Sequence, residues 1–283
     1  MSEIIPTLAR RRFIAQATAT VALPFARRVV AGESTSPGAG WVDCNAHLGP
    51  HPNRELPAIT AESLKSRGVT EAWVAPLEAL LHRDLTAVNA RHAARCGGPL
   101  RAVGVLHPGL PDWQEDLRRC TEEHGMRIIR LYPGYHGYTL DDPSLKKLLE
   151  LAAAKNLPVQ IVAEMENART QHPLMQVKPV DFKPLVNALQ QVPELRVMVL
   201  NASAVMAQTS LRGLGNLWLD IAMIEGVAGV ENLLKQWPAD RLVFGSHAPF
   251  FYPESSLLKM QESDLTAAQL MAVKSGNAKA WLA

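Results

Sequence analysis

The chain has 283 residues, of which 47% are hydrophobic and 20% charged, a balance that excludes a disordered or fibrous protein and fits one (β/α)8 barrel or two smaller domains. The formal net charge is +2, and no basic run beyond the first thirty residues could follow a phosphate backbone, which argues against nucleic acid as a partner. Three widely spaced cysteines give neither a CxxC metal site nor an evident disulfide framework, and no apolar stretch reaches the roughly 18 residues of a stable membrane span.

The first 31 residues resemble a twin-arginine export signal. Arg10 and Arg11 form the pair, Phe13 follows at the expected spacing, and a weakly apolar stretch runs over 13–25. Residues 32–40 have the composition of a linker. We therefore expect a signal segment at 1–31 and a periplasmic protein. The alternative is a basic N-terminal helix on a cytoplasmic protein.

From Trp41 onward, a short apolar run followed by a longer amphipathic stretch repeats along the chain. The apolar runs predict strands at 41–46, 71–76, 101–107, 127–132, 158–164, 196–201, 217–222 and 242–247. The amphipathic stretches predict helices at 60–67, 77–95, 113–124, 144–156, 183–191, 205–213, 227–236, 254–261 and 265–282.

This alternation predicts a single-domain α/β protein, with a (β/α)8 TIM barrel over 41–283. The alternative is an open, doubly wound sheet with a Rossmann-type site. That fold would place a GxGxxG turn after the first strand, where this chain has Asn45-Ala-His-Leu-Gly-Pro50 instead. The first loop therefore favours the barrel.

Catalytic groups of such barrels come from the carboxyl ends of the strands. The polar residues at or just past these ends include Asn45, His47, His107, Arg130, Tyr132, His136, Glu164, Asn201 and His247. Several histidines at one barrel mouth indicate a site more strongly than one histidine would. Another three, His82, His92 and His124, fall in predicted helices and are expected at the solvated surface.

Several segments, taken in order, resemble the amidohydrolase-related barrels. Asp43-Cys-Asn-Ala-His47 stands where that family has an Asp-x-His-x-His strand end, and Arg241–Pro249 stands where it has Gly-Ser-Asp-x-Pro. Gly125–Pro133 and Pro158–Val162 are similar to its fourth and fifth strands, and Gly276–Ala278 is similar to its closing helix. The resemblance covers nearly all of the chain after residue 40 and implies the barrel fold.

The metal ligands that the resemblance implies are mostly replaced. The family takes two histidines from strand 1, one each from strands 5 and 6, and an aspartate from strand 8. The corresponding residues here are Asn45, His47, Val162, Asn201 and His247. Only His47 matches, and a neutral amide is a poor zinc ligand. A divalent metal such as zinc, held by His47 and His247 with help from Glu164, stays open as a makeshift site.

The resemblance and these replacements suggest an amidohydrolase-like hydrolase with an atypical or absent metal, acting on a small polar or anionic lactone, ester or amide. We expect His247 to be the general base, since a histidine is a better base than an aspartate for water that no metal activates. Arg130 would bind a substrate carboxylate, and His47 with Asn45 would donate to an oxyanion. Glu164 would orient a histidine or a water.

Further substrate contacts are expected from His107, Tyr132, His136 and Asn201. Two other functions stay open. One is a catalytically silent, exported barrel that binds a small ligand or a partner. The other is a decarboxylase-like lyase.

Overall fold

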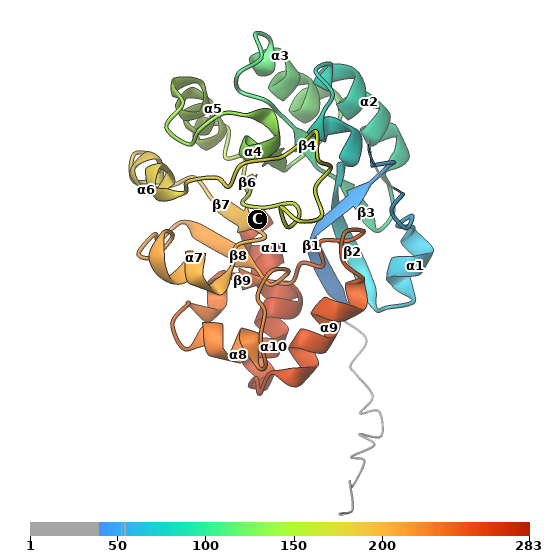
Figure 1. Cartoon of the computed structure of the whole chain (residues 1–283), viewed down its shortest axis with the longest axis vertical. Coiled ribbons are helices and arrows are strands. Elements are labelled where there is room, and N and C mark those ends of the chain that lie inside the picture. Colours follow the sequence, from blue (N-terminus) through green and yellow to red (C-terminus); the bar gives the residue numbers. More distant parts are fainter. Residues whose placement is uncertain (1–39, 52, 54) are drawn as a thin grey trace, which may run out of the picture. The chain divides into compact units, whose positions relative to one another are not determined.

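The computed structural model describes residues 40–51, 53 and 55–283. The predicted export signal, and residues 32–39 of the predicted linker, lie outside the described residues. From Trp41 onward, the predicted strands and helices are observed with their ends shifted by a few residues, except that the predicted helix 77–95 is divided into a 3-10 turn at 77–80 and a helix at 85–95. Helices form an outer ring around the strands (Figure 1).

All neighbouring strands of the described chain pair in parallel. They are β1 (Trp41–Leu48), β2 (Val69–Pro76), β3 (Leu100–Ala102), β4 (Gly104–Val105), β5 (Ile129–Leu131), β6 (Val159–Val162), β7 (Val197–Leu200), β8 (Leu217–Asp220) and β9 (Leu242–Val243). The third predicted strand is divided at Val103, whose N–H donates to the Val74 carbonyl at 2.9 Å. β3 and β4 therefore occupy one strand position between β2 and β5.

The segment that begins with β9 pairs with β1 and closes the ring. The N–H of Cys44 donates to the Phe244 carbonyl at 2.9 Å, and that of His47 donates to the Ala248 carbonyl at 2.8 Å. In return, the N–H of His247 donates to the Asn45 carbonyl at 2.7 Å. The fold is therefore the predicted (β/α)8 barrel.

The helices and helical turns are α1 (Ala61–Lys65), η1 (Leu77–Leu80), α2 (Leu85–Arg95), α3 (Trp113–Arg118), η2 (Arg119–Glu123), α4 (Pro133–His136), α5 (Pro143–Ala154), α6 (Lys183–Gln190), α7 (Ala204–Thr209), α8 (Gly229–Leu234), η3 (Ala239–Arg241), α9 (Pro253–Glu262), α10 (Ala267–Met271), η4 (Ala272–Gly276) and α11 (Asn277–Leu282). Local sequence explains where α5 begins. The Asp142 side chain caps it by accepting from the N–H of Ser144, and Pro143 occupies the first position, where no N–H is needed.

Strand alternation separates two layers of side chains. In β5 and β6, Ile129 and Ile161 point outward and pack with the leucines of α5. Their neighbours Arg130 and Gln160 are also completely buried, and they bond to each other inside the barrel. The barrel interior is therefore polar toward its mouth.

One expectation for the helices was wrong. His92, on α2, is only 2% exposed, because its helix face packs against the barrel wall. Its Nε2 bonds to the Val74 carbonyl at 2.8 Å, so that Nε2 carries the ring proton.

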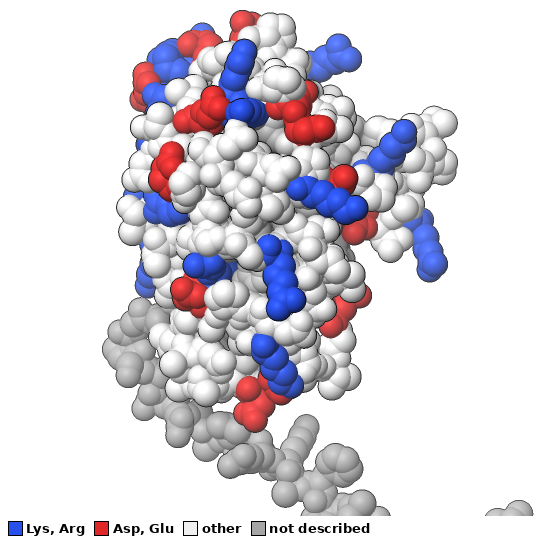
Figure 2. Space-filling model, turned by 90° about the vertical axis from the view of Figure 1, so that its left-hand side faces the viewer, with Lys and Arg blue, Asp and Glu red and all other residues white. Residues whose placement is uncertain are grey.

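Basic and acidic side chains are interspersed on the face of the molecule seen in Figure 2. Within the part of the chain that the structure describes, no helix combines the length and apolar character needed to cross a membrane.

Candidate active site

Polar side chains meet inside the barrel at the carboxyl ends of the strands. We call this set the central cluster; its members are Asp43, Asn45, His47, Arg130, Gln160, Asn201, Asp220, Ser246 and His247. Each is at most 2% exposed. The ring centroids of His47, at the end of β1, and His247, after β9, lie 5.4 Å apart.

Arg130 forms all of its hydrogen bonds inside the barrel. Its N–H groups donate to Gln160 Oε1, to His47 Nε2 and to the carbonyl oxygens of Ala46, Cys44 and Trp73, at 2.8–3.3 Å. A guanidinium has five N–H donors, and these bonds use all of them. The carboxylate-binding role expected for Arg130 therefore has no donor in this arrangement. Arg130 ties strands together instead.

The bond with Arg130 fixes the protonation state of His47. Arginine has no acceptor, so His47 Nε2 must accept, and the ring is neutral with its proton on Nδ1. Burial and the positive charge of Arg130 lower the pKa of His47 well below its usual value, and a backbone contact with Ala248 offsets part of this decrease. Nδ1 makes no hydrogen bond of normal geometry among the described residues. His47 is therefore a neutral donor.

Two asparagines continue the network from Asp220. Asn45 Nδ2 donates to Asp220 Oδ2 and to Asn201 Oδ1, both at 2.7 Å. Asn201 Nδ2 then donates to the Glu164 carbonyl at 2.6 Å and to His247 Nδ1 at 3.2 Å. Each amide nitrogen uses both of its hydrogens. Asn45 therefore has no N–H left for the oxyanion role that we expected.

His247 has both ring nitrogens engaged. Nδ1 accepts from Asn201, and Nε2 donates to the Met165 carbonyl at 2.6 Å. The ring is therefore neutral, and Phe250 stacks on it with centroids 4.8 Å apart. A general base needs a free lone pair, and in this arrangement the lone pair of Nδ1 already accepts a hydrogen bond.

Asp43 closes the cluster at its far side. Its carboxylate accepts from the N–H of Ser246 at 2.9 Å, from Ser246 Oγ at 2.5 Å and from the N–H of Asn45 at 3.1 Å. Burial raises its pKa to about 6 even though these bonds favour the ionised form.

The chemistry of the donors does not fit a divalent metal. Among the five positions where the resemblance implies ligands, Asn45 and Asn201 offer amides and Val162 offers nothing. The accepting nitrogens of His47 and His247 already receive hydrogen bonds from Arg130 and Asn201. No group of three or more His, Cys, Asp or Glu side chains in the described chain is placed to hold a metal ion.

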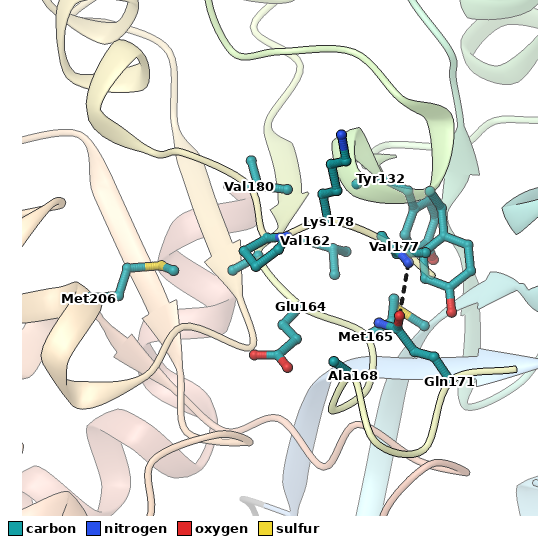
Figure 3. Close-up of a pocket in the computed structure, with 14 residues that line it drawn as sticks. Tyr132, Val162, Glu164, Met165, Ala168, Gln171, Val177, Lys178, Val180 and Met206 are labelled. Carbon is teal, nitrogen blue, oxygen red and sulfur yellow. Dashed lines mark hydrogen bonds between the residues drawn. The ribbon is translucent and has the colours of Figure 1, made fainter. Parts of the chain in front are cut away.

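A cavity of about 110 Å³ opens beside the central cluster, under the long loop 163–182 that follows β6 (Figure 3). We call it the loop cavity. Its wall is mostly apolar and includes Tyr132, Val162, Glu164, Met165, Lys178 and Met206. Val162, where the resemblance implies a histidine ligand, is part of this apolar wall.

Glu164 is the carboxyl group of the loop cavity. It also lines a second cavity, of about 370 Å³, together with Asn201, Ser203 and Glu225. Partial burial, and then the negative charge of Glu225, raise the pKa of Glu164 above its usual value. An accessible carboxylate with a raised pKa is suited to accept a proton.

Tyr132 belongs to the same wall, and its hydroxyl is buried. It is 1% exposed, and burial raises its pKa while the nearby Arg130 opposes the increase. Within the described residues, this hydroxyl makes no hydrogen bond of normal geometry. Its proton is therefore not committed to a protein acceptor, and the hydroxyl itself lies buried beside Arg130.

Polar contacts hold the loop over the cavity. The Tyr135 hydroxyl, on α4, donates to Glu166 Oε1 at 2.6 Å. Within the loop, the N–H of Val177 donates to Gln171 Oε1 at 2.8 Å (Figure 3). A loop of this length without regular structure is often a lid over a site.

His107 and His136 lie elsewhere. Their rings stack on each other, with centroids 4.6 Å apart, and neither ring lines the loop cavity or the second cavity. His136 Nε2 bonds to the Ala79 carbonyl at 2.9 Å, and the N–H of Gly109 donates to His107 Nδ1. Their placement lends no support to the substrate contacts expected of them.

Sequence reasoning missed Gln160 and Glu225. Gln160 could have been found, because a glutamine inside the apolar run Val159–Val162 is a buried polar group that needs a partner. Glu225 lies in a loop after β8 and carries no comparable signal.

Comparison with protein families matches residues 42–283 to the amidohydrolase model. The crystal structure of 2,6-dihydroxybenzoate decarboxylase from Rhizobium is similar, with a TM-score of 0.66, 12% identity, and coverage of 87% of this chain and 99% of that one. The structure of 5-carboxyvanillate decarboxylase from Sphingomonas paucimobilis gives a TM-score of 0.66, 11% identity and the same coverage. A putative 2-pyrone-4,6-dicarboxylic acid hydrolase from Pseudomonas putida gives a TM-score of 0.63 and 19% identity, covering 87% of this chain and 98% of that one. No curated protein sequence matches the chain.

Proposed function

This chain belongs to the amidohydrolase family, and we propose that it hydrolyses a small ester, lactone or amide in the loop cavity, with Glu164 as the general base. The observation that carries the proposal is an exposed carboxyl-bearing residue, Glu164, in the wall of a mostly apolar cavity at the barrel mouth, with Tyr132 in the same wall. Family membership supports an enzyme, because the similar solved structures include decarboxylases and a putative hydrolase.

Hydrolysis needs a base for water and a donor for the carbonyl oxygen. The Glu164 carboxylate accepts the proton of the attacking water, and its raised pKa brings it closer to neutral pH. When the tetrahedral intermediate collapses and the acyl C–O or C–N bond breaks, the protonated Glu164 returns this proton to the leaving oxygen or nitrogen. For the carbonyl oxygen we propose the Tyr132 hydroxyl as the donor, which requires the cavity wall to open toward this buried group when the substrate binds. The apolar wall around Val162 excludes water from the rest of the substrate.

His247 and Arg130 have no reacting role in this proposal. His247 lacks a free lone pair, and Arg130 lacks a free N–H. His47 keeps a donor at Nδ1 and can assist with the oxyanion if the substrate reaches it. The base role expected for His247 therefore moves to Glu164.

Decarboxylation is less well supported by the geometry. Loss of carbon dioxide leaves negative charge on carbon, which a nearby cationic donor would stabilise. In the central cluster, Arg130 is fully engaged, while His47 and His247 are neutral, so Lys178 in the wall of the loop cavity would have to supply the positive charge. An assay for aromatic carboxylic acids still belongs in the test, because similar structures include decarboxylases.

A ligand-binding barrel without turnover is the second candidate. The observation that favours it is the saturation of the central cluster, where Arg130 and His247 bond only to the protein. Such a protein would use the loop cavity to bind a small ligand.

The experiment is a hydrolysis screen of small lactones, esters and amides, with aromatic carboxylic acids tested for release of carbon dioxide. Substrates that are turned over are then tested with Glu164→Gln. We expect hydrolysis by the native protein and a loss of about 10²–10⁴-fold in kcat/KM for the variant, the usual contribution of one general base.

Glu166→Gln is the matched control. It removes the same charge two residues further along, and a glutamine still accepts from Tyr135. Its kcat/KM should stay near that of the native protein. Carbon dioxide release without hydrolysis would contradict the proposal, as would binding of panel compounds without turnover.

We also propose export through the twin-arginine route, from the pattern at Arg10 and Arg11. Replacing both by Lys should keep the protein in the cytoplasm. A native protein found only in the cytoplasm would contradict this.

A further inference from the structure

The hydrogen-bond network of the central cluster ends on the backbone of the loop. Asn201 Nδ2 donates to the Glu164 carbonyl, and His247 Nε2 donates to the Met165 carbonyl, both at 2.6 Å. These are consecutive carbonyl groups at the point where β6 passes into loop 163–182. Two residues that stand where the family has metal ligands thus contact the main chain that carries Glu164.

The backbone of both residues has an unusual conformation. Asn201 has φ +59° and His247 has φ +56°, in the left-handed region that residues other than glycine seldom adopt. Such conformations persist where the surrounding structure requires them, often at functional sites. Here they aim both side chains at one stretch of the loop.

The network is anchored at its other end by Asp220. Its carboxylate accepts from the N–H of Asn201 and from Asn45 Nδ2, each at 2.7 Å. Gly245 leaves the room that this carboxylate needs, because a Cβ at that position would lie 2.5 Å from Asp220 Oδ2. Asn45 links the anchor to Asn201, so the chain of bonds is continuous from the β8 strand to the loop.

We propose that Asn201 and His247 are positioning residues that clamp the Glu164–Met165 backbone to Asp220, and so hold the Glu164 carboxyl in the loop cavity. The inference rests on the proposed function of Glu164. It gives the former ligand positions a new role. The protein holds its reacting group through hydrogen bonds where its family uses metal coordination.

His247→Asn and His247→Gln form the test pair. Asparagine tolerates the left-handed backbone better than glutamine does, but its amide is too short to reach the Met165 carbonyl. The longer glutamine can place an N–H where His247 Nε2 now lies. If residue 247 only had to adopt the left-handed backbone, the asparagine variant would be closer to the native protein. If it must donate to the Met165 carbonyl, the glutamine variant will be closer.

The first readout is trypsin cleavage after Arg169, which lies exposed in loop 163–182. We expect His247→Asn to be cleaved about 3- to 10-fold faster than the native protein, the effect of losing one hydrogen bond, with His247→Gln close to native. Asn201→Asp, which keeps the size and the backbone tolerance but replaces the donors by acceptors, should behave like His247→Asn. The urea midpoint of each variant separates loop opening from global unfolding.

The second readout is kinetic. His247→Asn should lower kcat with little change in KM, and His247→Gln should restore it. Equal rates of trypsin cleavage in the native protein and all variants would overturn the proposed clamp. Equal loss of kcat in both His247 variants, with native cleavage rates, would also overturn it, because the imidazole itself would then be reacting. Faster cleavage of His247→Asn, together with full activity of Glu164→Gln, would leave the clamp standing and reject the proposed function.

Discussion

The central cluster and the loop cavity adjoin each other at the same end of the barrel, yet their polar groups are used differently. In the cluster, every side-chain N–H of Arg130, Asn45 and Asn201 donates a hydrogen bond to another group of the protein. In the wall of the cavity, Glu164 is exposed, and the buried Tyr132 hydroxyl makes no hydrogen bond of normal geometry among the described residues. At this barrel mouth, hydrogen-bond saturation therefore separates scaffold from site better than residue type does.

The largest expected effect is on stability, from Arg130→Met. The substitution leaves the buried carbonyl groups of Cys44 and Ala46 without donors and removes the cation among buried carboxylates. We expect a decrease of about 3–5 kcal/mol in the free energy of unfolding, measured in urea.

Arg95→Met is the matched control for that substitution. The Arg95 side chain is 53% exposed and pairs with Glu78 at 3.2 Å, so its loss should cost less than about 1 kcal/mol. A similar small effect at Arg130 would mean that Arg130 is not part of the scaffold.

His92 lies outside both regions. A substitution there tests whether burial keeps imidazole side chains neutral in this barrel. Burial lowers its pKa to about 4. The folded protein therefore binds fewer protons than the unfolded chain between about pH 6.5 and 4, and its contribution to stability, complete above pH 6.5, is lost as the pH falls through this range, by about 3 kcal/mol. His92→Gln keeps a donor for Val74 but cannot titrate, so its stability should fall less on acidification. Identical pH dependence in the two proteins would refute this.

Glu225→Gln tests whether the charge of Glu225 helps to set the pKa of Glu164. The negative charge of Glu225 raises the pKa of Glu164, so its removal should lower that pKa. Because the base works only when ionised, the acidic limb of the kcat/KM profile should then move to lower pH, by less than about one unit. A limb that stays in place would mean that another group sets it.

The smallest expected effect is that of a chelator. Since the ligand positions are occupied by amides, a valine and hydrogen-bonded histidines, a chelator should change neither the unfolding midpoint nor kcat/KM. Elemental analysis of the same sample should find well under one equivalent of any divalent metal. Activity that falls with the chelator and returns with zinc would instead support the makeshift site.

Much of the fold could be predicted from the sequence. Eight apolar runs alternate with amphipathic stretches, and few folds bury both the apolar strands and the apolar faces of the helices. The division at Val103 and the short α4 turn carry no such periodic signal. Their place at the strand ends also marked His47 and His247 as candidates for one site, and their rings lie 5.4 Å apart.

The use of those side chains could not be predicted. Whether Arg130 meets a substrate or five protein acceptors depends on the positions of carbonyl groups from distant strands, such as Trp73. The sequence also gave no distance between Asn201 and the loop after β6. Residue type and strand position therefore identified the candidates, while the hydrogen-bond partners decided between scaffold and site.

The most direct test compares two substitutions four residues apart at the end of one strand. Gln160→Met removes a member of the central cluster, and Glu164→Gln removes the carboxylate of the loop cavity. We expect Gln160→Met to lower the free energy of unfolding by about 1–3 kcal/mol and to leave kcat/KM near native. We expect the reverse for Glu164→Gln, with kcat/KM lower by about 10²–10⁴-fold and stability within about 0.5 kcal/mol of native. Full activity in Glu164→Gln, or an equal loss of activity in Gln160→Met, would contradict this.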